Sequence, residues 1–348
     1  MSSIFIFVLS FILLNMFGSC PSTTCEQGDL CSLNTEQKVG QLFIIGIDGT
    51  KVDEEMEAII KNLHPSGVLL LGKNIENKEQ LEKLISDLQV IAKKDTGLSL
   101  FIAVDQEGGV VNRIDFLEEK TAQKDIKTKE KAYQVGFNRG KELKELGVNL
   151  NLAPLLDEVK ENDFIFNRAF QENQDKISEL AKELIRGQKE AGILTCIKHF
   201  PGYGGVTFHP EDNLGERQEF PETKQFGEVM EQNPEFVMTA NVVYKEIGDL
   251  PFTFLKKGVE KIKKELGDSV LIMSDDLDQY SLLNNYSLEN IVVKPVEAGV
   301  DILIFSGWRL PARDGIKALL SAVEQGKIEQ EIIDKSLNRI IEIKEKLK

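Results

Sequence analysis

Eight short apolar runs, separated by segments with helical patterning, constrain the fold of this chain more than any other feature. Each run is bounded by Gly, Pro or polar residues, which is typical of strands buried on both faces of a parallel sheet. The runs are residues 41–46, 67–71, 100–104, 148–153, 193–197, 236–242, 270–273 and 300–305.

The segments between the runs have the period of amphipathic helices. In residues 79–93, the apolar residues Leu81, Leu84, Leu88 and Ile91 fall at three- and four-residue steps and form one stripe. Similar patterns occur in residues 129–146, 176–191, 255–266 and 328–347. Strands that alternate with helices in this way predict a parallel sheet covered by helices.

Eight strand–helix units over about 315 residues predict the α/β class and a (β/α)₈ barrel of the TIM type, forming a single catalytic domain. An open doubly wound sheet is the alternative, but no Gly-x-Gly-x-x-Gly turn follows the first run. The helical pattern continues to the C-terminal residues, so no second domain is expected.

The N-terminal residues differ from the rest. Residues 1–25 contain no charged side chain, and residues 4–17 are almost wholly apolar. As a helix, the apolar stretch measures about 21 Å, which is shorter than the roughly 30 Å apolar core of a bilayer and fits an export signal. It ends in FGSC (residues 17–20), which resembles the box before the lipidated cysteine of bacterial lipoproteins. A signal that is cleaved without modification of Cys20 is the alternative.

The expected organisation is an export signal over residues 1–20, lipidated at Cys20, a tether over residues 21–34 and the barrel domain over residues 35–348. This organisation predicts an exported, membrane-anchored bacterial lipoprotein, in the periplasm or at the cell surface, or otherwise a periplasmic or secreted protein. The lipid anchor would be its only contact with the membrane. We expect a monomer.

Composition excludes several classes of protein. Apolar residues make up 41% of the chain, which is too many for a disordered protein. The formal net charge of −15 argues against a nucleic-acid partner, because phosphates need a basic surface. The three His and four Cys show no zinc-like spacing, so we expect no metal. Cys196 is predicted to be a buried thiol, while Cys25 and Cys31 are close enough in sequence to pair in an oxidising compartment.

Polar groups follow at least five of the predicted strands. The active site of a barrel of this type lies at the C-terminal ends of its strands, so these groups are expected to share one mouth. They are residues 105–113 (DQEGGVVNR), Pro154, Asp157, residues 167–170 (NRAF), residues 198–205 (KHFPGYGG), Asn241 and residues 274–276 (SDD).

These segments resemble glycoside hydrolase family 3, and specifically its single-domain bacterial β-N-acetylhexosaminidases. The resemblance spans residues 35–308. The matching segments, in family order, are KVGQLFIIGIDGT (38–50), HPSGVLLLGKNIEN (64–77), VDQEGGVVNR (104–113), NLAPLLD (151–157), NRAF (167–170), KHFPGYG (198–204) and MSDDL (273–277).

The resemblance implies an exo-acting, retaining hydrolase without a cofactor. Such an enzyme removes a terminal β-linked N-acetylglucosamine, here from glycans derived from peptidoglycan or from other amino-sugar glycans. Two alternatives remain. One is β-glucosidase-like activity, although relatives with that activity usually carry a second domain. The other is a surface lipoprotein that binds sugar with weakened catalysis.

The resemblance also assigns residues. Asp275 matches the carboxylate nucleophile that retaining hydrolysis requires; the alternative role is capping the following helix. Five residues match those that bind the sugar, for which charged groups make strong hydrogen bonds. They are Asp105, Arg113, Arg168, Lys198 and His199. Structural alternatives are an Arg168–Asp157 ion pair and a hydrogen-bonded core histidine at position 199.

The acid/base position departs from the family pattern. The relatives continue from Lys-His-Phe-Pro-Gly-His-Gly into a loop with Asp-Ser-His, whereas this chain has Tyr203 in the first segment and His209-Pro210-Glu211 at the loop position. Three interpretations follow. Glu211 donates the proton directly, or His209 donates it and a neighbouring carboxylate orients it, or the acid/base has been lost.

Overall fold

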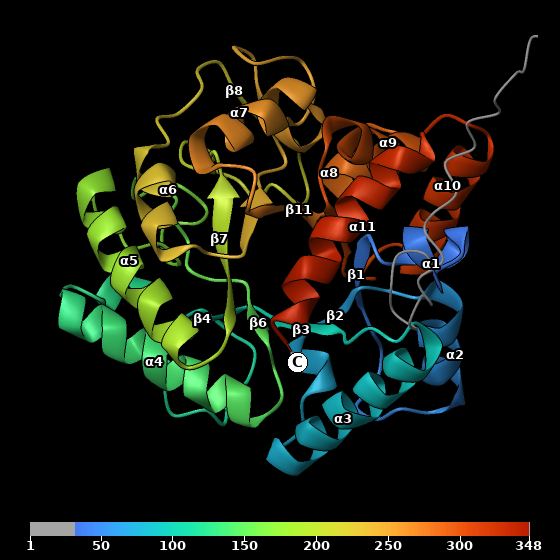
Figure 1. Ribbon diagram of the computed structural model, residues 1–348. Coiled ribbons are helices and arrows are strands. Elements are labelled where there is room, and N and C mark those ends of the chain that lie inside the picture. Colours follow the sequence, from blue (N-terminus) through green and yellow to red (C-terminus); the bar gives the residue numbers. More distant parts are fainter. Residues whose placement is uncertain (1–31, 348) are drawn as a thin grey trace, which may run out of the picture.

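The computed structural model describes residues 32–347, and its centre is a closed barrel of eight parallel strands (Figure 1). The strands follow one another round the barrel in chain order, and the last pairs with the first. They are β1 (Phe43–Gly46), β2 (Gly67–Leu70), β3 (Phe101–Val104), β6 (Leu150–Asn151), β7 (Leu194–Phe200), β9 (Phe236–Thr239), β11 (Leu271–Asp276) and β12 (Ile302–Phe305). All eight predicted strands and the predicted barrel are confirmed.

Helices surround the barrel, and the five predicted helical segments are among them. The longer helices are α2 (Glu54–Leu63), α3 (Lys78–Asp95), α4 (Lys129–Glu145), α5 (Gln174–Glu190), α7 (Lys256–Leu266), α9 (Leu288–Ala298), α10 (Ala312–Glu324) and α11 (Gln330–Glu345). The short ones are α1 (Thr35–Gly40), α6 (Lys224–Glu228) and α8 (Tyr280–Leu283), with 3₁₀ turns at Gly72–Asn74, Gln123–Asp125, Val229–Gln232 and Phe252–Phe254. In α3, the predicted stripe is buried and Asn77 caps the N-terminus by accepting a hydrogen bond from Gln80.

Two strands extend beyond the apolar runs that predict them, and a third apolar run is divided between two strands. β7 continues to Phe200 and β11 to Asp276, because the polar residues at their ends line the mouth of the barrel. The run 236–242 is split into β9 and a separate strand β10 (Val242–Tyr244), which pairs with β8 (Gly215–Arg217). A second small sheet joins β4 (Gln106–Gly108) to β5 (Val111–Asn112).

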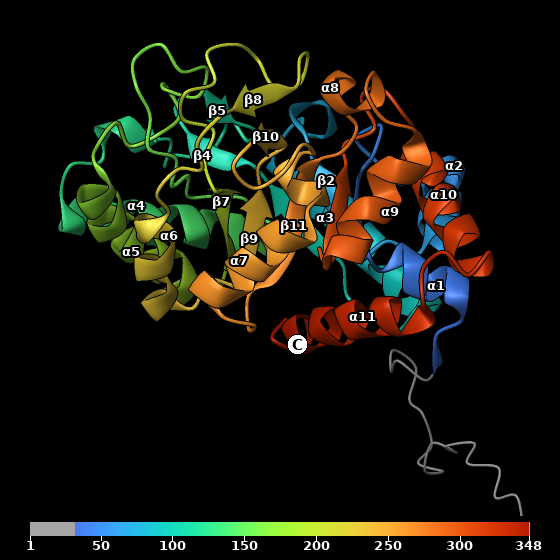
Figure 2. The ribbon, with the colours of Figure 1, turned by 90° about the horizontal axis from the view of Figure 1, so that it is seen from above.

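The two ends of the barrel are built differently. Figure 2 shows β4, β5, β8, β10 and α8 at one end and α1 and α11 at the other. At the α11 end, Lys344 is buried, and its Nζ donates hydrogen bonds to Gln41 Oε1 at 2.9 Å and to the Ser66 carbonyl at 2.8 Å. Lys344 therefore closes the N-terminal end of the barrel, which leaves the opposite end for a site.

Cys196 is a buried free thiol, as predicted. The predicted export signal, Cys20 and the Cys25–Cys31 pair lie outside the described residues. Within residues 32–347, no helix has both the length and the apolar character needed to cross a membrane.

Candidate active site

A cavity of about 290 Å³ opens at the C-terminal ends of the strands. It is lined by every residue that is predicted to act in catalysis or sugar binding: Asp105, Arg113, Arg168, Lys198, His199, His209, Glu211 and Asp275. These residues come from segments as far apart in sequence as β3 and β11, and the closed barrel brings them to one mouth as expected from its topology.

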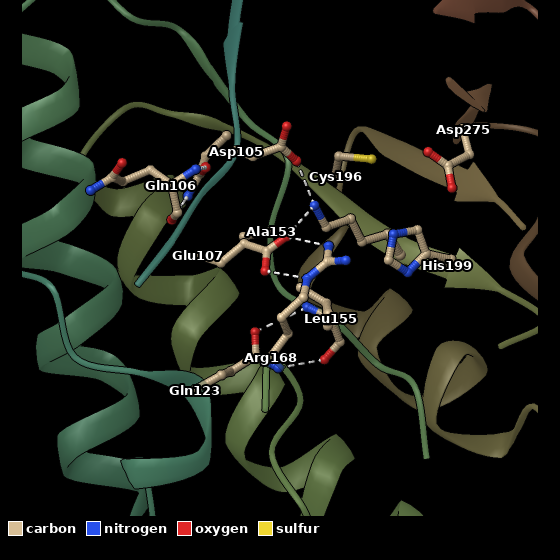
Figure 3. A network of polar contacts seen from close by, with 12 residues as sticks. Asp105, Gln106, Glu107, Gln123, Ala153, Leu155, Arg168, Cys196, His199 and Asp275 are labelled. Atoms are coloured by element: carbon tan, nitrogen blue, oxygen red, sulfur yellow. Dashed lines mark hydrogen bonds and ion pairs between the residues drawn. The ribbon is translucent and has the colours of Figure 1, made fainter. Parts of the chain in front are cut away.

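A buried carboxylate, Glu107, organises one side of the cavity (Figure 3). Arg168 binds it through two hydrogen bonds, of 3.0 Å from Nε and 2.7 Å from Nη2, and Lys198 Nζ lies 2.6 Å from its Oε1. Lys198 also donates to Asp105 Oδ1 at 2.6 Å. Burial alone would raise the pKa of Glu107, but the two cations outweigh it and hold this pKa well below its usual range. The result is a fixed array of alternating charges, which we call the ion network.

A tight turn positions Glu107. Gly108 follows it with a φ of 84°, a conformation that favours glycine, and a Cβ at this position would lie 2.2 Å from the Thr121 carbonyl oxygen. Arg139 is buried beneath the turn and donates to the Glu107 carbonyl at 2.7 Å. A glycine at position 108 is thus needed for this geometry.

Arg168 pairs with Glu107 and not with Asp157, so the structural alternative considered for Arg168 is wrong. Asp157 instead accepts hydrogen bonds from His199 Nδ1 at 3.0 Å and from the Tyr203 amide at 2.7 Å. Burial raises the pKa of Asp157, but His199 and the other hydrogen-bond donors lower this pKa by more, so the net shift is downward. His199 is both buried and hydrogen-bonded, as the core alternative required, and it also lines the cavity.

Asp275 lies near the end of β11, apart from the ion network in Figure 3. Its Oδ2 accepts a hydrogen bond of 2.6 Å from the Tyr203 hydroxyl, and its Oδ1 accepts one of 2.7 Å from the Asp276 amide. Burial and the adjacent Asp275 raise the pKa of Tyr203 well above its usual value, so Tyr203 stays a donor. Helix α8 begins five residues later with Gln279 at its N-cap, and Asp275 does not cap it.

Asp276 is the second carboxyl group of the Ser-Asp-Asp segment, and it also lines the cavity. Its Oδ1 accepts hydrogen bonds from the Ser306 and Asp278 amides. Burial raises the pKa of Asp276 to about 7. The two neighbouring carboxyl groups therefore have different surroundings.

His209 and Glu211 lie on the loop between β7 and β8 and both reach the cavity wall. The exposed His209 ring packs 5.7 Å from the ring of Phe164. Glu211 Oε2 accepts a hydrogen bond of 3.1 Å from Arg309, and its carbonyl accepts one from the Ser281 amide. Glu211 thus ties this loop to the segments that follow β11 and β12.

Arg113 follows β5 and presents an unused donor. Its Nε is buried and, within residues 32–347, has no hydrogen-bond partner. An unsatisfied buried donor is costly unless a ligand supplies the acceptor, which indicates that this side of the cavity is built for a polar ligand.

Several residues of the site were not predicted. Glu107 lies in the segment VDQEGG, at the end of a predicted strand, and this position could have identified it as a site residue. Tyr203 was noted only as a departure from the family pattern, without its contact to Asp275. Trp308 and Arg309 lie three and four residues beyond the eighth apolar run, at the end of a strand for which no site residue is predicted.

The profile of the family described as "Glycosyl hydrolase family 3 N terminal domain" matches residues 34–343. A β-hexosaminidase of Idiomarina loihiensis is 30% identical, over 81% of this chain and 88% of that protein. β-Hexosaminidase A of Pseudoalteromonas piscicida is 28% identical, over 86% of this chain but only 56% of the relative's length.

Solved structures show the same similarity. A family 3 β-N-acetylglucosaminidase from Paenibacillus sp. has a TM-score of 0.85 at 29% identity, covering 90% of this chain and 63% of that chain. A β-N-acetylhexosaminidase from Beutenbergia cavernae has a TM-score of 0.83 at 26% identity, covering 90% of this chain and 98% of the other.

Proposed function

The chain belongs to glycosyl hydrolase family 3 and is a glycosidase, and we propose that it removes a terminal β-linked N-acetylglucosamine from a glycan. The observation that carries this proposal is that one cavity contains both Asp275, which Tyr203 holds, and the ion network. A β-glucosidase reaction is not favoured, because the relatives described above are β-hexosaminidases and a β-N-acetylglucosaminidase.

We assign the ion network to the terminal sugar. Asp105 and Lys198 offer an acceptor and a donor to neighbouring hydroxyl groups, and Arg113 supplies a free guanidinium donor. Hydrogen bonds to charged groups are about twice as strong as neutral ones, and they are stronger still in a site that excludes water. Glu107 keeps Lys198 and Arg168 in position before the sugar arrives, which limits the entropy lost on binding.

The reaction proceeds in two displacements. Asp275 attacks the anomeric carbon, the bond to the leaving oxygen breaks, and the acid/base residue gives that oxygen a proton. Water then attacks the glycosyl–Asp275 ester while the same residue takes a proton from that water, which releases the sugar and restores both Asp275 and the acid/base residue. Tyr203 acts as a positioning residue, because it holds Oδ2 at 2.6 Å and leaves the carboxylate aimed at the substrate.

For the acid/base we favour His209 over Glu211. Glu211 accepts a hydrogen bond from the Arg309 guanidinium and would have to leave that partner to donate a proton. His209 is exposed on the same loop and lines the cavity. Histidine is also the side chain that most often acts as a general acid and base in enzymes.

The activity test compares p-nitrophenyl N-acetyl-β-glucosaminide with p-nitrophenyl β-glucoside. We expect turnover of the first and little of the second. Saturable sugar binding without turnover of either substrate, or of peptidoglycan fragments, would support the sugar-binding alternative and refute the enzymatic proposal.

We also propose that the chain is an exported lipoprotein, anchored through Cys20, that acts as a monomer on peptidoglycan-derived glycans. The uncharged residues 1–25 and the FGSC segment support the anchor. Palmitate labelling of the full chain in a bacterial host, lost in Cys20→Ser but kept in Cys196→Ser, is the expected result. Equal labelling of the wild-type chain and Cys20→Ser would contradict the anchor.

A further inference from the structure

The rim of the cavity carries the only tryptophan of the chain, Trp308, in the loop after β12. The residue is 63% exposed, the second highest exposure among the large apolar residues with an exposed surface. A single exposed apolar residue needs no explanation by itself. Trp308 differs because it lines the same cavity as Asp275, and because its loop is fixed.

Hydrogen bonds on both sides of Trp308 hold this loop. The Ser306 amide donates to Asp276 Oδ1 at 3.1 Å, and the Arg309 amide donates to Asp278 Oδ2 at 2.7 Å. Both acceptors belong to the segment that follows Asp275. The backbone on both sides of Trp308 is therefore held in position relative to the end of β11, which limits the entropy lost when a ligand contacts this loop.

A cation restrains the ring itself. Lys73 Nζ, in the 3₁₀ turn after β2, lies 5.1 Å from the centre of the Trp308 ring, and it is bound to Asp48 at 2.7 Å. A cation at this distance is attracted to the ring face. The ring is thus an apolar surface on the rim that is in place before a ligand binds.

The order of strands gives the direction in which a bound glycan extends. The residues of the ion network lie on β4 and β7, directly after β3 and on the segment between β6 and α5, whereas Asp275 lies on β11 and Trp308 follows the adjacent strand β12. A sugar whose hydroxyl groups contact the ion network and whose anomeric carbon meets Asp275 directs its leaving group past Asp275. That direction leads toward the loop of Trp308.

We propose that Trp308 is the platform on which the second sugar ring, that of the leaving group, stacks. The inference rests on the proposed function and adds to it a preference for glycans over small leaving groups. Pyranose rings have an apolar face that packs against aromatic rings, and an indole offers the largest such surface. The occupant is therefore a β-linked amino-sugar disaccharide or longer glycan.

Because Trp308 is the single tryptophan, its fluorescence reports on this position alone. In the full chain with Asp275→Asn, which prevents turnover, a β-1,4-linked N-acetylglucosamine disaccharide should change the emission saturably. N-Acetylglucosamine alone, whose binding is followed by calorimetry, should leave the emission nearly unchanged. An equal change with the monosaccharide would place the indole over the first sugar and overturn the inference.

A kinetic comparison separates this inference from the proposed function. We expect Trp308→Ala to lower kcat/KM for the disaccharide by about tenfold through KM, with partial recovery in Trp308→Phe. Phe116→Ala is the matched control, because Phe116 is also exposed but lies outside the cavity. Unchanged disaccharide kinetics in an active Trp308→Ala variant would refute the platform alone, whereas no hydrolysis by the wild-type chain would refute the proposed function.

Discussion

At the scale of single residues, the orientation of the Asp275 carboxylate depends on a small number of hydrogen bonds. Within residues 32–347, its two oxygens accept one hydrogen bond each, from a tyrosine hydroxyl and from a backbone amide. The Tyr203 hydroxyl in turn accepts a hydrogen bond of 3.0 Å from the Asn241 amide. This series of hydrogen bonds from Asn241, between β9 and β10, through Tyr203 to Asp275 orients the carboxylate and is open to a direct test.

Tyr203→Phe removes the hydroxyl and keeps the buried ring. The loss of a hydrogen bond to a charged group costs about 1.5–3 kcal/mol, so we expect kcat/KM to fall by roughly 10- to 100-fold. Tyr286→Phe, a partly buried tyrosine that packs on Phe254 away from the cavity, should retain full activity. Wild-type kinetics for Tyr203→Phe would show that this contact does not position Asp275.

The choice of acid/base is tested by substrates that differ in their need for a proton. We expect His209→Ala to lower kcat/KM for a disaccharide by about 10²- to 10⁴-fold, and much less for an aryl glycoside with a good leaving group. Azide should restore part of its activity. Glu211→Gln should have a small effect on both substrates, and the opposite ranking of the two variants would assign the role to Glu211.

At the scale of the elements, strand order was predictable and long-range pairing was not. Apolar runs identify the strands because both faces of each strand are buried. The runs end too early at β7 and β11, because Lys198 and Asp276 continue these strands with side chains that line the cavity. The pairs Glu107–Arg168 and Glu211–Arg309 depend on how the loops meet over the closed barrel, and residue spacing carries no signal for such contacts.

The ion network should contribute to stability as well as to binding. Glu107→Gln leaves Lys198 and Arg168 without their buried carboxylate, so we expect a loss of about 3–5 kcal/mol in the free energy of unfolding. Denaturant unfolding measures this change. Glu118→Gln, an exposed substitution in the segment between β5 and α4, should change it little, and a similar value for both variants would mean that Glu107 has no central role.

At the scale of the whole molecule, each end of the barrel contains a buried lysine, and the two lysines have different kinds of partner. At the catalytic end, Lys198 has two carboxylates beside it. At the closed end, Lys344 has neutral partners, and burial lowers its pKa well below the usual value. The molecule therefore contains a buried base that binds a proton more weakly when folded than when unfolded.

This difference predicts a pH dependence of stability. Between the lowered pKa of Lys344 in the folded chain and the ordinary lysine pKa of about 10.4, the unfolded chain binds more protons at Lys344 than the folded chain, so this residue makes stability rise with pH. The free energy of unfolding of the wild type, relative to Lys344→Met, should increase as the pH rises toward about 10. Lys346→Met, which removes an exposed lysine of the same segment, should show no such trend, and a constant difference for Lys344→Met would contradict the prediction.

The central claim is that Asp275 becomes covalently bound to the sugar. A 5-fluoro glycosyl fluoride of N-acetylglucosamine forms the glycosyl ester faster than water removes it, so the ester accumulates and its mass can be measured. We predict that one sugar is added per chain and that peptide mapping finds it on Asp275, with no addition in Asp275→Ala. A wild-type enzyme that is active but carries the sugar on another residue, or on none, would contradict the account.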